Sequence, residues 1–250
     1  MSSAPLRQLP LWGADADATP EWRVRESARA RRLSVRVWRD GAVEVVVPRR
    51  TRPEEVARFV THHRPWIERQ RARCRPPEPE HFPPARIELV ATGESWACAV
   101  APVAGAPPEA RSGRLAVTSG TLWLAAGLEP GRQRLALRRW LVERAQSAFA
   151  GPLAALAAEM RAGYRQLQIR RQRTRWGSCS TRGTISLNCC LLFQRPEVVR
   201  YLMVHELAHV EHMNHSARFW RQVERFEPRW RELDRELVQG WRQVPRWALG

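Results

Sequence analysis

The part of the sequence best suited to chemistry is an H-E-x-x-H motif formed by His205, Glu206 and His209. Residues i and i+4 of a helix lie one above the other on the same face, so both imidazoles can reach one metal ion. Glu206 is rotated by about 100° from His205, given ~3.6 residues per turn, and its carboxylate can therefore address a water molecule on the metal. The spacing predicts a zinc site that activates water, with Glu206 as general base in the attack on a carbonyl.

A catalytic zinc site usually has three protein ligands and one open position, so a third ligand must follow. His212 lies seven residues after His205, which is about 10.5 Å along a helix at ~1.5 Å per residue, and one ion cannot easily hold both ends of that span. Asn214 tolerates the left-handed conformation that ends a helix, so the chain can turn back and bring His215 under the metal. We favour His215, while His212 and the downstream carboxylate of Glu232 stay open as alternatives.

The elements that must position these residues are a helix and the strand before it. Pro196 is typical of a first helical position, and the predicted helix runs from there to about His212. Its apolar residues leave only a narrow polar stripe, which indicates burial. Residues 184–193 begin with alternation and end in a continuous apolar run, which predicts a largely buried strand. We expect an extended substrate to pair with this strand beside the helix.

Three sequence blocks resemble the YgjP-like metallopeptidase family, which is related to the SprT and WLM zincin-like proteases. The blocks read R-W-G-S-C-S-T-R-G-T-I-S-L-N from Arg175, P-E-V-V-R-Y-L-M-V-H-E-L-A-H from Pro196 and M-N-H-S-A-R-F-W from Met213. The segments R-A-R-R-L-S-V-R-V and H-R-P-W-I in the first half are also similar to this family. The resemblance therefore extends from about Arg29 to Trp241.

This resemblance implies a zinc peptidase in which His205, His209 and His215 bind the metal and Glu206 is the catalytic glutamate. It assigns four residues to the block that seats the third ligand, namely Asn214, Ser216, Phe219 and Trp220.

Four further residues are candidates for contacts with the substrate or the oxyanion, or for supporting the ligands: Arg175, Asn188, Tyr201 and His212. An arginine can hydrogen-bond a carboxylate or an oxyanion, but it can equally fix a turn before a strand. A tyrosine four residues before His205 lies on roughly the same helix face, where packing with a satisfied hydroxyl is the common role.

The rest of the chain predicts an α+β fold in which a strand-rich N-terminal module packs on a zincin-like catalytic half. Residues 1–28 are rich in Pro, Ala and Asp, and we expect a poorly ordered lead-in. Residues 29–130 show alternating strand patterns with one helix that begins near Thr51. Residues 131–250 change to helical periodicity, with an interruption expected at Gly151-Pro152 before the metallopeptidase half.

The chain has 250 residues, with 42 Lys+Arg against 25 Asp+Glu, and every one of these cations is arginine. Clustered arginine neutralises phosphates, and residues 161–175 are especially rich in it. Phosphate binding gives no reason to exclude lysine, however, so the complete absence of lysine favours a compositional bias. Nucleic acid is therefore a partner that we consider but do not favour.

The five cysteines show no C-x-x-C spacing, which disfavours a disulfide framework and predicts a cytoplasmic location. No uncharged apolar run approaches the ~18 residues of a membrane helix, so no membrane partner is expected. We predict a zinc metallopeptidase that binds one Zn²⁺ ion and hydrolyses unfolded or flexible polypeptides. The alternatives are a DNA-associated protease that acts on DNA-bound proteins, and a zinc-stabilised binding module with little activity.

Overall fold

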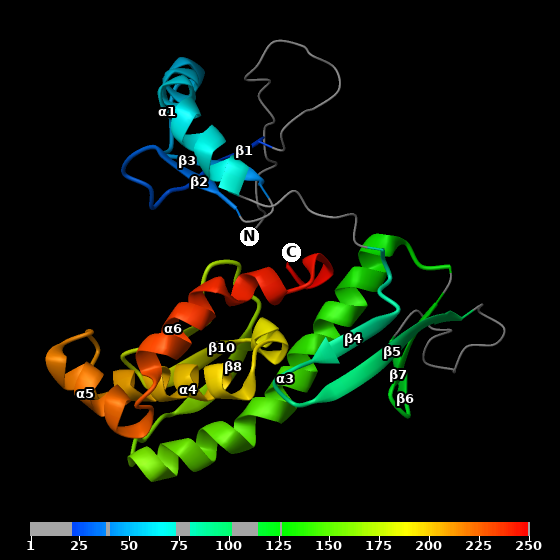
Figure 1. The fold of residues 1–250 in the computed structure, drawn as a ribbon. Helices are drawn as coiled ribbons and strands as arrows, with labels where there is room; N and C mark the ends of the chain where they lie inside the picture. Colours follow the sequence, from blue (N-terminus) through cyan, green and yellow to red (C-terminus); the bar gives the residue numbers. More distant parts are fainter. Residues whose placement is uncertain (1–21, 39–40, 74–80, 102–114, 126, 250) are drawn as a thin grey trace. The chain divides into compact units, whose positions relative to one another are not determined.

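The computed structural model describes residues 22–38, 41–73, 81–101, 115–125 and 127–249. The chain divides into two compact units, residues 1–79 and 80–250, and both mix helices with strands (Figure 1). The predicted α+β class is confirmed, while the proposed divisions at 1–28, 29–130 and 131–250 stay a prediction. Most of the expected lead-in lies outside the described residues. None of the described helices combines the length and the apolar character that a membrane crossing requires.

In the first unit, one helix packs against a small sheet. The strands are β1 (Trp22–Glu26), β2 (Ser34–Val37) and β3 (Val43–Val47), and the helix is α1 (Pro53–Arg73). The central strand β3 is parallel to β1 and antiparallel to β2. Val45 and Val47 of β3 share a small apolar core with Val56 and Val60 of α1, which explains the alternating pattern of the strand.

The second unit begins with a sheet that packs on a long helix. Its strands are β4 (Arg86–Leu89), β5 (Glu94–Ala101), β6 (Ala116–Thr118) and β7 (Thr121–Ala125), in the order β4-β5-β7-β6. The helix α3 (Pro130–Met160) follows them in the chain. Leu122 and Leu124 of β7 and Leu137 and Leu141 of α3 belong to one buried core.

Helix α3 is continuous, so the predicted interruption at Gly151-Pro152 is wrong. Proline inside a helix removes a backbone hydrogen bond and costs about 3 kcal/mol. Phe149 and Leu153 flank this point, and both are buried in the main core. The burial of these turns offsets the free-energy cost of Pro152 within the helix. Local sequence rules miss this stabilisation because it comes from tertiary packing. The helix ends at Met160, and the next residue, Arg161, has a left-handed backbone with a φ of 54°.

A second sheet and three helices complete this unit. The strands are β8 (Gln166–Arg170), β9 (Gly177–Cys179) and β10 (Thr184–Asn188), in the order β8-β10-β9, with β10 parallel to β8 and antiparallel to β9. The helices are α4 (Pro196–Glu211), α5 (Ala217–Phe226) and α6 (Trp230–Gln239), and both α5 and α6 pack on α4. The edge strand β9 also contacts α4. Two short 3-10 helices, η2 (Gly240–Gln243) and η3 (Arg246–Ala248), follow.

The buried strand predicted over residues 184–193 is only half correct. Strand β10 ends at Asn188, and residues Cys189–Phe193 form a 3-10 helix, η1. The Asn188 side chain accepts a hydrogen bond of 3.0 Å from the backbone N–H of Cys190, which starts this turn. All five residues of η1 are buried. The apolar run therefore indicated burial correctly, but burial alone does not select between a strand and a helix.

The core of the second unit predicts a large difference between two leucines of α3. Leu141 is fully buried, whereas Leu135 is 42% exposed. We expect Leu141→Ala to lower the free energy of unfolding by about 2–5 kcal/mol, because it removes buried methyl groups and leaves a cavity. The matched change Leu135→Ala should lower it by less than about 0.5 kcal/mol. Urea unfolding of both variants measures this difference, and equal losses would contradict the packing described above.

Candidate metal centre

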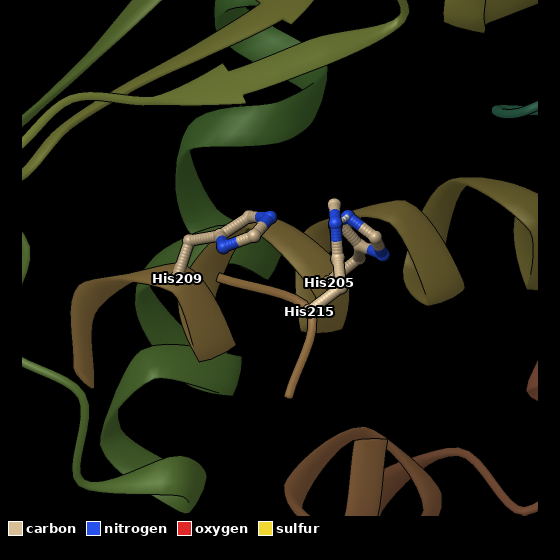
Figure 2. A group of neighbouring side chains, drawn as sticks. All are labelled: His205, His209 and His215. Atoms are coloured by element: carbon tan, nitrogen blue, oxygen red, sulfur yellow. Dashed lines mark hydrogen bonds between the residues drawn. The ribbon is translucent and has the colours of Figure 1, made fainter. Parts of the chain in front are cut away.

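Three histidines converge beside helix α4. His205 and His209 are one helical turn apart on α4, and His215 lies in the loop that precedes α5; Figure 2 shows the three rings gathered together. One ring nitrogen from each lies within 4.8 Å of those of the other two, and the Nε2 atoms of His205 and His215 are 3.2 Å apart. Two ligands of a tetrahedral zinc ion at about 2.0–2.1 Å lie roughly 3.3 Å apart. The His205–His215 distance matches this spacing, and the three ring nitrogens together could hold a metal ion.

The end of α4 orients the second of these rings. Nδ1 of His209 lies 2.9 Å from the backbone carbonyl oxygen of His212, which follows the last residue of the helix. A carbonyl oxygen only accepts hydrogen bonds, so His209 donates from Nδ1 and keeps the lone pair of Nε2 for a metal. His212 thus supports the site through its backbone, and its side chain is not needed for this contact.

The start of α5 holds the third histidine. Ser216 caps this helix, and its hydroxyl accepts a hydrogen bond of 3.4 Å from the backbone N–H of Phe219. Phe219 is fully buried, and its ring centroid lies 4.5–4.9 Å from those of all three histidines. The ring of Trp220 stacks on His215 with an interplanar angle of 22°. The block that resembles the known family is therefore the segment that fixes His215 in this structure.

Burial favours the neutral form of the His205 and His209 imidazoles. Burial lowers the pKa of His205 to about 3, and the neighbouring His209 and His215 lower it further in the same direction. Burial also lowers the pKa of His209. A metal binds the neutral form of imidazole, so these two shifts suit His205 and His209 to metal binding at neutral pH.

Glu206 lies on the same helix with its carboxyl group buried against strand β9. Its side chain is 4% exposed, and its Oε2 has no hydrogen-bond partner among the described residues. A Cβ atom added to Gly177 of β9 would lie 2.5 Å from Oε1 of Glu206, so only glycine allows the strand to pass this close. Burial raises the pKa of Glu206 to about 8, while the positive charge of Arg175 acts in the opposite direction. A carboxyl group with such a pKa is suited to exchange protons near neutral pH.

The other candidates have different surroundings. The Asn188 side chain is buried and donates to the backbone carbonyls of Gln172 (2.6 Å) and Arg175 (2.9 Å), so it holds the loop before β9 and is not open to a substrate. The Arg175 side chain is exposed, close enough to act on the charge of Glu206. Glu232 is exposed and pairs with Arg229, away from the group of three histidines.

Tyr201 is fully buried, and its hydroxyl donates a hydrogen bond of 2.8 Å to Oδ1 of Asp234 on α6. The same oxygen lies 3.4 Å from Nδ1 of His205. Burial raises the pKa of this phenol, and the contact with Asp234 adds to the shift, so Tyr201 stays protonated.

Sequence reasoning missed Asp234 and the role of Gly177. Asp234 lies 33 residues beyond Tyr201, and no local spacing links them before α6 packs on α4. For Gly177, a signal was present, because a glycine at the start of a strand often marks a close approach of another group. The approaching group, Glu206, could not be identified from the sequence.

Comparison with models of protein families finds that residues 31–239 match the YgjP-like metallopeptidase domain. A search of curated proteins finds no match. Two solved structures of metallopeptidase zymogens are similar to parts of the chain. Abylysin of Pyrococcus abyssi is 28% identical over 41% of this chain and 93% of its own, with a TM-score of 0.31. Jannalysin of Methanocaldococcus jannaschii is 18% identical over 35% of this chain and 90% of its own, with a TM-score of 0.32.

The geometry predicts that substitution of His215 lowers Zn²⁺ affinity, whereas substitution of His212 leaves it nearly unchanged. His215→Ala removes a ring nitrogen from the cluster and should weaken Zn²⁺ binding by at least about 100-fold, since a three-ligand site becomes a two-ligand site. His212→Ala keeps the backbone carbonyl that orients His209, so Zn²⁺ affinity should stay within about threefold of wild type. Competition with a chromophoric chelator measures both affinities. Equal losses, or a loss in His212→Ala alone, would overturn this assignment.

Proposed function

The chain belongs to the YgjP-like metallopeptidase family, and from this we propose that it is a zinc-dependent peptidase with His205, His209 and His215 as ligands and Glu206 as general base. One observation carries the proposal. Three imidazoles converge on one point, while the adjacent buried glutamate has an oxygen with no hydrogen-bond partner among the described residues. A structural zinc site has no need of such a base and usually closes the fourth position with a protein ligand. This feature favours an enzyme over a zinc-stabilised binding module.

A zinc ion held by the three histidines would lower the pKa of a water molecule and polarise the peptide carbonyl. Glu206 takes the proton from the attacking water and later delivers it to the leaving amine. Burial raises the pKa of Glu206 to about 8, which makes its carboxylate a stronger base for the first of these steps. We propose that Arg175, exposed beside this carboxyl group, contacts the oxyanion or a carboxylate of the substrate.

The expected substrate-binding strand needs a correction. Strand β10 lies between β8 and β9, so both of its edges are already paired and it cannot accept a substrate strand. Strand β9 is at the edge of the sheet, contacts α4 and passes directly over Glu206. We propose that an extended polypeptide pairs with β9. Backbone pairing with so short a strand favours flexible or unfolded substrates and demands little of their sequence.

The arginine excess does not support a DNA-associated function by itself, because several arginines have structural partners. Arg138 donates hydrogen bonds to the backbone carbonyls of Trp247 (2.6 Å) and Leu249 (3.3 Å), tying the end of the described chain to α3. Arg144 of the same helix pairs with Glu94 of β5. These contacts give two of the arginines a structural role that needs no phosphate partner. A DNA-associated protease stays the alternative, and a cleavage assay with added DNA would test it.

Replacing the proposed base tests the function directly. Glu206→Gln keeps the shape of the side chain but cannot accept the proton, so cleavage of an unfolded protein should fall by at least about 100-fold. Bound zinc, measured by atomic emission, should equal that of wild type. The matched control is Glu211→Gln at the exposed end of the same helix, which should retain full activity. Cleavage by Glu206→Gln at the wild-type rate would refute the mechanism.

The close approach of β9 to Glu206 generates a second prediction. Gly177→Ala places a methyl group where the carboxyl group lies, and Glu206 must move. A displacement of about 1 Å can reduce turnover by roughly 100-fold, so we expect that loss at unchanged zinc content. Gly163→Ala is the control, because an added Cβ there meets no atom within 4 Å. If both variants cleave equally well, the close approach has no role in catalysis.

A further inference from the structure

A chain of three polar groups connects α6 to the proposed metal ligand His205. The hydroxyl of Tyr201 lies between Oδ1 of Asp234, at 2.8 Å, and Nδ1 of His205, at 3.4 Å. Tyr201 is one helical turn before His205 on α4, and Asp234 comes from α6, which packs against α4. Asp234 belongs neither to the H-E-x-x-H motif nor to the segment that carries His215.

The donors and acceptors in these three groups allow only one direction for the hydrogen bonds between them. A carboxylate only accepts hydrogen bonds, and a phenol has one proton to donate. Tyr201 donates that proton to Asp234, so its oxygen can only accept from His205. The proton of His205 must then be on Nδ1, and the lone pair of its Nε2 is free. That Nε2 lies 3.2 Å from Nε2 of His215, on the side where the three histidines converge.

Burial makes this arrangement difficult to exchange for another. Tyr201 is fully buried, and the ring of His205 meets the Tyr201 ring edge-on, with centroids 6.0 Å apart and an interplanar angle of 75°. A rotated or differently protonated imidazole would leave the Tyr201 oxygen without a donor in a dry environment. Such an unsatisfied buried group is unfavourable. The second contact of the imidazole thus selects the form that binds metal, as supporting partners of metal-bound histidines generally do.

We propose that Asp234 is a positioning residue that acts through Tyr201 to set the tautomer and the orientation of His205. The inference rests on the proposed function insofar as His205 is a zinc ligand. Asp234 is not among the three grouped donor residues, and its effect reaches His205 through one hydroxyl group. This support comes from α6, so the packing of α6 on α4 contributes to metal affinity.

The test uses the full-length chain with Asp234→Asn, which keeps the shape of the side chain. An amide can donate a hydrogen bond to the Tyr201 oxygen, which turns the phenolic proton toward His205 and favours the tautomer protonated on Nε2. Tyr201→Phe removes the connecting hydroxyl altogether. The matched control is Glu232→Gln, which changes an exposed carboxylate on the same helix that pairs with Arg229.

Two measurements report the outcome. Nitrogen-15 NMR of the imidazoles in the metal-free protein should show His205 protonated on Nδ1 in wild type and in Glu232→Gln, and a change in Asp234→Asn. Competition with a chelator should show Zn²⁺ affinity lowered by about 10–100-fold in Asp234→Asn and Tyr201→Phe, and unchanged in the control. Urea unfolding in the metal-free state shows that the variants are folded.

Wild-type tautomer and wild-type zinc affinity in a folded Asp234→Asn protein would overturn the inference. Equal losses of affinity in Asp234→Asn and Glu232→Gln would also overturn it, because they would indicate a general effect of charge on α6. The tautomer measurement needs neither metal nor substrate. A zinc-loaded wild type that cleaved nothing would therefore refute the proposed function and leave the result on Asp234 standing.

Discussion

Holding three imidazole nitrogens close enough for one ion is the constraint on which much of the second unit depends. Each ring is oriented by a different part of the fold. The end of α4 presents the His212 carbonyl to His209, the start of α5 stacks Trp220 on His215, and α6 reaches His205 through Tyr201. Both α5 and α6 pack on α4, so the packing of these helices brings the three supports together. Such partners contribute to metal affinity because they reduce the freedom that each ligand would otherwise lose.

The buried carboxyl group of Glu206 imposes a second constraint. Its ionised form is unfavourable in apolar surroundings, which is why its pKa is raised to about 8. This unfavourable buried carboxyl group lies next to the histidines, and functional sites are where such destabilising groups are expected. Strand β9 closes over the carboxyl group with a glycine, while the Asn188 side chain fixes the loop before that strand. In the proposed function, substrate pairing and proton transfer take place at this same edge of the sheet.

Near the site, local patterns predicted the strand that becomes β10 and the helix that becomes α4, and the failures of these patterns share one cause. The helix that begins at Pro196 follows from proline preference and apolar periodicity. Local preferences do not predict the continuous helix α3 or the 3-10 helix η1, because each depends on how much surface the complete core buries. The same limit applies to the substrate strand. The sequence indicates that residues 184–188 are a strand, but only the pairing order reveals that β10 is central and β9 is the edge.

For the candidate site, the sequence by itself determined the residues whose relation is local. His205, Glu206 and His209 are related by the helical repeat, so their placement on one helix follows from spacing. The sequence favoured His215 as their neighbour but left His212 and Glu232 open as alternatives. The tertiary structure decided the relations between residues that are distant in the chain. Asp234 reaches Tyr201 only because α6 packs on α4, and Gly177 meets Glu206 only because β9 lies against the same helix. The physical reason is that backbone geometry fixes neighbours within about one helical turn, whereas contacts across the core depend on the burial of all elements together.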